Sequence, residues 1–232
     1  MGGSYSAQAS IDSYSSKEQV RVWNTVAANE GAKLRGFIKA GRDVRFMDGE
    51  GKSLLTHACL AEAHECLAAL IEAGCEVDAK DEAGWTAAAY AAGWNFSNCL
   101  AILIDAGCDI DSRDAHGRTP AMEAASMGSI DCLGALMRAG CDVEAKDEDG
   151  RSALHGAVER GGASCAAALL DAGCSLGDDG GAALLALASH FGHEDFPECR
   201  RLIMSAMAAR ERSELDAEAP GRDAPKGRPF SI

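Results

Sequence analysis

The chain has 232 residues, of which 47% are hydrophobic, 25% charged and 5% aromatic, a composition that excludes general disorder. Its formal net charge of −14 repels phosphate backbones, which argues against a nucleic-acid partner and favours a protein partner with a basic surface or a basic peptide. No apolar run reaches the roughly 18 residues that a membrane span needs, and the first residues lack the apolar core of a secretory signal. We therefore expect a cytoplasmic protein without a transmembrane segment.

Residues 1–16 are predicted to form a flexible N-terminus. Met1-Gly2 with Ser6 matches the pattern for N-myristoylation of Gly2, although the match is short. No basic cluster follows, so one acyl chain alone would give weak and reversible membrane attachment. The alternative to a freely diffusing protein is thus an adaptor on the cytoplasmic side of a membrane, acylated at Gly2.

From residue 48 onward the sequence repeats every 33 residues, which predicts a stack of equivalent structural units. Four sets of residues share this period: an Asp, a turn Gly, a Cys and a later Gly-Cys pair. They divide the chain into full units at 48–80, 81–113, 114–146 and 147–179. The Gly-Cys pairs are Gly74-Cys75, Gly107-Cys108, Gly140-Cys141 and Gly173-Cys174.

The unit 114–146 shows the expected local structure most clearly. A tight turn around Gly117 precedes Thr119-Pro120, which suits the start of a first helix. Gly128 ends that helix, and apolar residues with a period near 3.6 form a second one that ends at Gly140. One such helix pair cannot bury its apolar face alone, so neighbouring units must cover each other.

The segments that flank the four units are predicted to cap the stack. Residues 17–47 form a degenerate N-terminal cap, and residues 180–210 form a C-terminal cap whose spacing slips. Together they extend the array over 17–210, and we expect it to be a monomer. The charged tail 211–232 holds three of the five prolines and is predicted to be disordered.

These motifs resemble the ankyrin repeat. Thr119-Pro120 and Ser152-Ala153-Leu154-His155-Gly156-Ala157 match the first half of that motif, and paired apolar residues such as Leu169-Leu170 match the second half. The resemblance implies an all-α helical solenoid of helix-turn-helix units joined by hairpin-like turns. It also implies a non-catalytic protein-protein interaction module or adaptor that binds its partner through a concave face. One departure is Glu62, which occupies the position expected for the Gly between the helices.

The chain contains ten cysteines, and their spacing indicates packing rather than chemistry. Equivalent residues in stacked units should lie about one helix diameter apart, roughly 10 Å, whereas a disulfide needs Cα atoms within about 7 Å. A small hydrophobe in a tight core is the preferred interpretation. A redox-responsive or metal-responsive scaffold is the alternative, with His190, His193 and Cys199 as the zinc ligands one would consider. We assign no metal site.

No catalytic motif is present. The sequence lacks a phosphate-binding P-loop, a nucleophile elbow and an HExxH motif. We therefore expect neither enzymatic activity nor a cofactor.

The family resemblance places the turn tips and first helices on the concave face. Trp85 and Trp94 stand out there, because exposed tryptophans are enriched at interaction hot spots. The alternative is that both pack as peripheral core. The complete set predicted to bind the partner is Glu82, Trp85, Trp94, Arg113, His116, Arg118, Met127, Lys146, Arg151 and Arg160.

Overall fold

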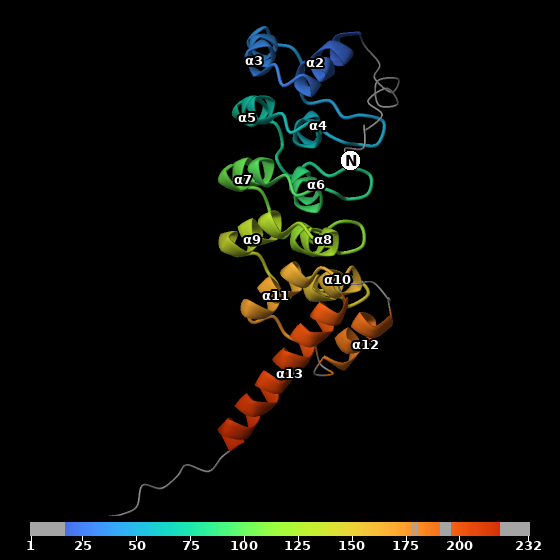
Figure 1. Cartoon of the computed structure of the whole chain (residues 1–232). Helices are drawn as coiled ribbons and strands as arrows, with labels where there is room; N and C mark the ends of the chain where they lie inside the picture. Colours follow the sequence, from blue (N-terminus) through green and yellow to red (C-terminus); the bar gives the residue numbers. More distant parts are fainter. Residues whose placement is uncertain (1–16, 178, 180, 191–195, 219–232) are drawn as a thin grey trace, which may run out of the picture.

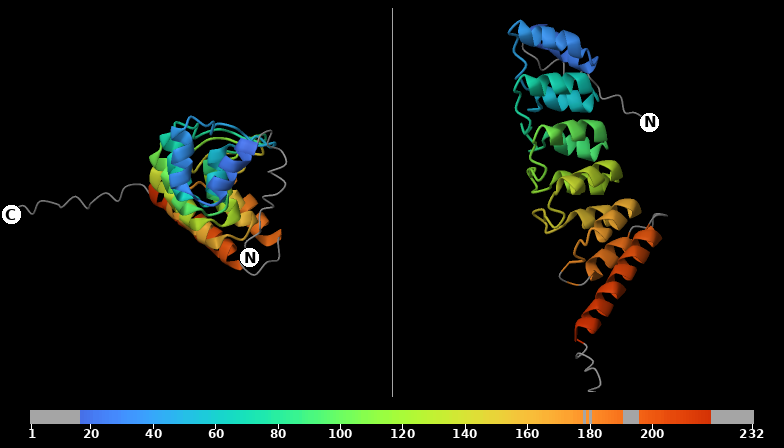
Figure 2. Two further views of the ribbon diagram at one scale, coloured as in Figure 1. Left: turned by 90° about the horizontal axis from the view of Figure 1, so that it is seen from above. Right: turned by 90° about the vertical axis from the view of Figure 1, so that its left-hand side faces the viewer.

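A computed structural model describes residues 17–177, 179, 181–190 and 196–218. Within these residues the chain is all-α and contains no β-strand. One isolated β-bridge joins Met47 and Ser53. The helices form two columns, and each pair of helices lies as a layer on the pair before it (Figure 1 and Figure 2). The predicted solenoid is therefore confirmed.

Each unit contributes one helix to an inner column and one to an outer column. A turn precedes each inner helix of the full units. We call the surface formed by these turns and the inner helices the inner face. The inner helices are α2 (Lys17–Ala27), α4 (Leu54–Leu60), α6 (Ala87–Gly93), α8 (Pro120–Met127), α10 (Ala153–Glu159) and α12 (Ala182–His190). The outer helices are α3 (Gly31–Lys39), α5 (His64–Glu72), α7 (Ser97–Asp105), α9 (Ile130–Ala139), α11 (Ala163–Asp171) and α13 (Phe196–Glu218).

Local signals in the sequence set where the inner helices begin and end. The hydroxyl of Thr119 accepts a hydrogen bond from Met122 N at 3.4 Å, and Pro120 occupies the first turn, as predicted. Gly128 ends α8 and Gly140 ends α9, both with a left-handed backbone. At the position equivalent to Gly128, the earlier units have Glu62 and Asn95, which take the same positive φ with a side chain present.

Backbone hydrogen bonds join the turn of each unit to the turn of the next. Ala115 N donates to Ala83 O at 3.0 Å, and Glu148 N donates to His116 O at 3.0 Å. The close approach explains Gly84, where an added Cβ would lie 2.7 Å from Ala115 N. The turns therefore form a continuous edge beside the inner helices.

Acidic residues in the segments that follow the outer helices also connect neighbouring units. The Asp78 carboxylate accepts a hydrogen bond from Asp109 N, and the Asp111 carboxylate accepts one from Asp142 N, each at 2.9 Å. Glu144 accepts one from Ser175 N at 2.6 Å. These three acidic side chains therefore link one unit to the next.

In α5, α7 and α9, the cysteine near the start of the outer helix packs against the inner helix of the preceding unit. The Cys66 thiol donates to Thr25 O at 3.8 Å, and the Cys132 thiol donates to Ala91 O at 3.4 Å. The Cys99 thiol donates to Cys59 O, one residue later in the inner helix, at 3.8 Å. The thiol is small enough for close helix packing and still offers a weak donor to a buried carbonyl.

The two ends of the array differ in regularity. At the N-terminal end, α2 and α3 form an ordinary helix pair that covers the first full unit through Val22, Trp23 and Leu34. At the C-terminal end, α13 runs obliquely to the layers (Figure 1) and continues to Glu218, past the predicted limit of the cap at residue 210. The residues from 211 to Glu218 are mainly Ala, Arg, Glu and Leu, which are strong helix formers.

Candidate functional site

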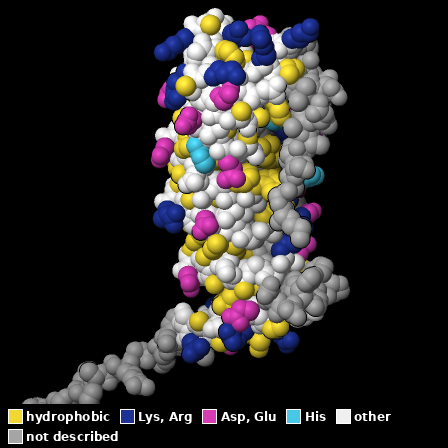
Figure 3. Space-filling model, turned by 45° about the horizontal axis from the view of Figure 1, so that its top comes forward, with side chains coloured by type: hydrophobic (Ala, Val, Ile, Leu, Met, Phe, Trp, Pro, Cys, Tyr) yellow, Lys and Arg dark blue, Asp and Glu magenta, His cyan; other side chains and the backbone are white. Residues whose placement is uncertain are grey.

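The inner face carries an apolar pocket at the predicted tryptophans. It has a volume of about 320 Å³ and is lined by Ala83, Trp85, Tyr90, Gly93, Trp94 and Met127. These residues come from the turn before α6, from α6 and its C-terminal end, and from the end of α8. In the space-filling view, hydrophobic side chains gather midway along the array (Figure 3). The structure thus brings together Trp85, Trp94 and Met127, three of the predicted site residues.

The two tryptophans occupy different environments. The side chain of Trp85 is half-buried and its ring lies against that of Tyr90, with 5.0 Å between centroids and an angle of 52°. Trp94 is 59% exposed and Met127 is 55% exposed, although both are large and apolar. Trp85 therefore forms the wall of the pocket, while Trp94 and Met127 are its accessible part.

A second pocket, of about 170 Å³, lies one unit further along the inner face. Its lining includes three predicted residues, Arg118, Arg151 and Arg160. Arg151 is ion-paired with Asp147 at 3.2 Å and with Asp149 at 2.8 Å. The guanidinium groups are thus partly balanced by carboxylates of the same unit, so this pocket is polar rather than strongly cationic.

One position of the inner helices carries a different side chain in each unit: His57, Tyr90, Glu123 and Gly156. His57 Nε2 lies 2.8 Å from Asp48 Oδ2, and the Tyr90 hydroxyl donates to Asp81 Oδ2 at 2.7 Å. Each of these contacts joins an inner helix to the Asp that begins its own unit.

Glu123 breaks this pattern because it offers a carboxylate where the earlier units offer a donor. It is 2% exposed, and neither its carboxylate oxygens nor Asp114 Oδ2 accept a hydrogen bond, although Arg118 Nη2 forms an ion pair with Glu123 Oε1 at 2.8 Å. Burial raises the pKa of Glu123; the charge of Arg118 opposes this rise, the charge of Asp114 adds to it, and that of Arg160 opposes it. The inner face therefore has a buried acidic group between its two pockets.

The remaining predicted residues are exposed along the turns. Arg113 uses its guanidinium within the array, donating to Gly117 O at 2.8 Å and to Lys146 O at 2.7 Å. Glu82, His116 and Lys146 are exposed on the turns and lie outside the lining of both pockets. The structure thus places Arg113 as a link between turns.

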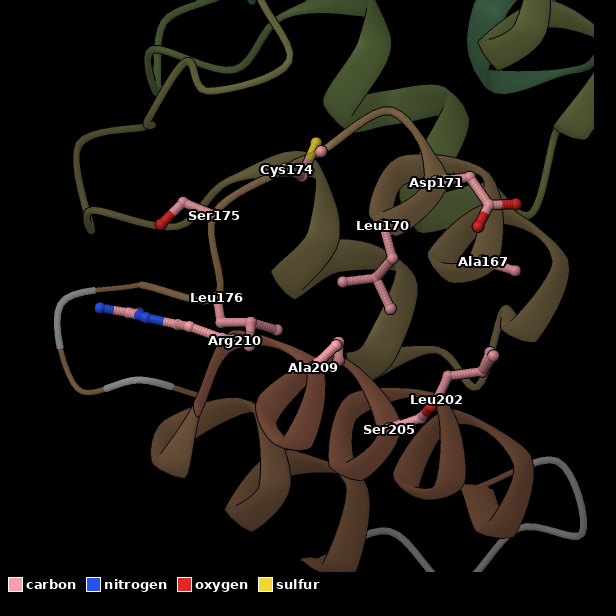
Figure 4. Close-up of a pocket in the computed structure, with 12 residues that line it drawn as sticks. Ala167, Leu170, Asp171, Cys174, Ser175, Leu176, Leu202, Ser205, Ala209 and Arg210 are labelled. Atoms are coloured by element: carbon pink, nitrogen blue, oxygen red, sulfur yellow. The ribbon is translucent and has the colours of Figure 1, made fainter. Parts of the chain in front are cut away.

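A larger pocket, of about 560 Å³, lies at the C-terminal end, between α11 and α13 (Figure 4). Leu170 of α11 and Leu202 and Ala209 of α13 point toward the space between the helices, and Leu176 closes one side. Sequence reasoning did not predict this pocket, because it depends on the oblique path of α13.

The described cysteines are all free, and all but the half-buried Cys75 are buried. Burial raises the pKa of Cys132 to about 12 and that of Cys66 to about 11, which keeps these thiols protonated at neutral pH. Among the described residues, no three His, Cys, Asp or Glu side chains converge as they would around a metal ion. The side chains of His190 and His193 lie outside the described residues, and so does Gly2.

Tyr90 and Glu123 are the inner-face residues that the sequence analysis missed. A signal for Tyr90 was available, since it precedes Trp94 by four residues and so shares one face of a helix with it. Glu123 occupies a position where the other units do not have an acid, but its burial depends on the neighbouring layers.

Comparison with known proteins agrees with this architecture. The family model for ankyrin repeats (3 copies) matches residues 25–114, 74–147, 99–179 and 121–209. A search of curated proteins finds no match. None of the described helices is both long and apolar enough to cross a bilayer. Since the family matches cover most of the chain, it belongs to the ankyrin-repeat family.

Proposed function

We propose that this protein is a non-catalytic adaptor that captures a partner protein on its inner face, at the pocket formed by Trp85, Tyr90, Trp94 and Met127. Ankyrin repeats generally mediate protein-protein interaction, which supports the general class. The observation that carries the site is the exposure of Trp94 and Met127 beside one apolar pocket. Large apolar side chains grouped in this way are typical of interaction surfaces.

The charge of the chain supports a partner with a basic surface or a basic peptide. The net charge of −14 attracts such a partner and accelerates its encounter with the array. We also propose that the protein acts as a cytoplasmic monomer. Acylation of Gly2 is the alternative that would place it on a membrane, and the intact mass of the native protein would detect the loss of Met1 and the added fatty acid.

The test is affinity capture with the whole chain and two variants, with bound proteins identified by mass spectrometry. The variant Trp94→Ala/Met127→Ala removes the two exposed side chains of the pocket, and we expect it to lose the partner while its thermal unfolding is unchanged. Met204→Ala is the matched control, because Met204 is also about half exposed but lies on α13. Equal capture by all three proteins would show that the partner binds elsewhere.

A further inference from the structure

Three of the six residues that line the inner-face pocket are aromatic. Two of the three tryptophans of the chain and one of its three tyrosines line it, together with Met127. The face of an aromatic ring carries negative potential, so several rings around one space favour a cation as well as an apolar group. The choice between these two ligands depends on the surrounding charges and hydrogen-bond acceptors.

The surrounding charges favour a cation. The turns that approach the pocket carry Glu50 and Glu82, both exposed, and Glu82 N donates to Glu50 O at 3.2 Å. None of the residues that line the pocket is charged. One cation of the protein lies over a pocket ring: the Lys52 ammonium is 5.7 Å from the centroid of Tyr90 and is ion-paired with Glu50. The Tyr90 ring therefore already contacts an ammonium within the protein, and the charge of that ammonium is balanced.

Three polar groups of the pocket already have hydrogen-bond partners within the protein. The carbonyl of Ala83 accepts Ala115 N at 3.0 Å, and the carbonyl of Gly93 accepts the hydroxyl of Ser129 at 2.9 Å. The Tyr90 hydroxyl is directed to Asp81. A primary ammonium would lose hydration in this pocket and would have to share these groups with their present partners, whereas an N-methylated ammonium has few or no N–H groups to satisfy.

We infer that the pocket formed by Trp85, Tyr90, Trp94 and Met127 binds an N-methylated lysine side chain on a basic segment of the partner protein. The methylammonium group lies among the aromatic rings, and the alkyl part of the side chain packs on Trp94 and Met127. This inference rests on the proposed function and adds the chemical class of the ligand.

The test uses short basic peptides that differ only in one central residue, titrated into the whole chain by isothermal calorimetry. The central residue is trimethyllysine, its neutral isostere with a tert-butyl group in place of the trimethylammonium, or unmodified lysine. We expect trimethyllysine to bind about two- to thirtyfold more tightly than the isostere, which is the range of a cation-π contact. Trp94→Ala should abolish this preference, and Met204→Ala should retain it.

Three results would overturn the inference. Equal or tighter binding of the isostere would show that the pocket takes an apolar side chain. Equal or tighter binding of unmodified lysine would show that methylation is not recognised, and absence of binding by all three peptides would exclude a lysine-type ligand. In each case the capture experiment with Trp94→Ala/Met127→Ala still decides the proposed function separately.

Discussion

The units 81–113 and 114–146 share one backbone plan, yet they present different chemistry at the same position of the inner helix. Tyr90 donates to Asp81, which satisfies that carboxylate and sets the ring against Trp85. Glu123 meets the equivalent Asp114 as a second carboxylate, and both retain buried oxygen atoms without hydrogen-bond partners. The residues that repeat every 33 positions therefore determine how the helices stack. The residues that differ between units determine the charge and hydrogen bonding of the inner face.

Removing the Tyr90 hydroxyl is expected to have the largest effect on stability. In Tyr90→Phe the ring remains, but Asp81 Oδ2 loses the donor at 2.7 Å, and we expect a loss of about 1–3 kcal/mol in the free energy of unfolding. Urea unfolding followed by circular dichroism measures this change. If the midpoint is unchanged, the Tyr90 hydroxyl does not stabilise the turn of its unit.

Replacing Glu123 by Gln should make the third unit resemble the second. The neutral amide can donate to Asp114 Oδ2 and still accept from Arg118, whose guanidinium lies 2.8 Å from Glu123 Oε1, and we expect a gain of about 1 kcal/mol at pH 7. Burial raises the pKa of Glu123 in the folded protein, so the folded state holds its proton more tightly than the unfolded state. The stability that this proton contributes is present below the ordinary pKa of Glu, about 4.3, and is lost as the pH rises through the raised value.

The advantage of Glu123→Gln over the native protein should therefore grow as the pH increases from about 4 to about 7. Urea unfolding at both pH values measures it. Glu159→Gln is the matched control, because Glu159 is an acid of the next unit that is partly exposed. The same advantage at both pH values would show that Glu123 is not protonated preferentially in the folded state.

The smallest predicted effect concerns the end of the inner helix, where Glu62, Asn95 and Gly128 take the same left-handed backbone. Asn tolerates this conformation better than Glu, and Asn95 Oδ1 also accepts Cys132 N at 3.2 Å. We expect Glu62→Asn to stabilise the array by about 0.5–1 kcal/mol. A rise in the thermal midpoint would support this reasoning, and Glu65→Asn, at an exposed site within α5, should not reproduce it.

Much of the fold could be predicted because each unit uses strong local signals. Thr119, Pro120 and Gly128 mark the ends of α8 in the sequence, and the structure has them in these roles. The pocket was predicted in part, through Trp85, Trp94 and Met127, because a repeat motif assigns its positions to faces. Tyr90 was missed because its contacts with Asp81 and Trp85 join the helix to the turn of its unit, and these contacts depend on how the turn packs.

The sequence by itself determined the period of 33 residues, the ends of the helices and the close stacking that small residues such as Ala91 and Cys132 allow. These features depend on backbone conformation and side-chain size, which are local properties. Only the tertiary structure decided that Glu123 is buried beside Asp114, that Arg113 links the turns, and that α13 crosses the end of the stack. Burial and hydrogen bonding join residues of different layers, so their outcome depends on how the layers pack.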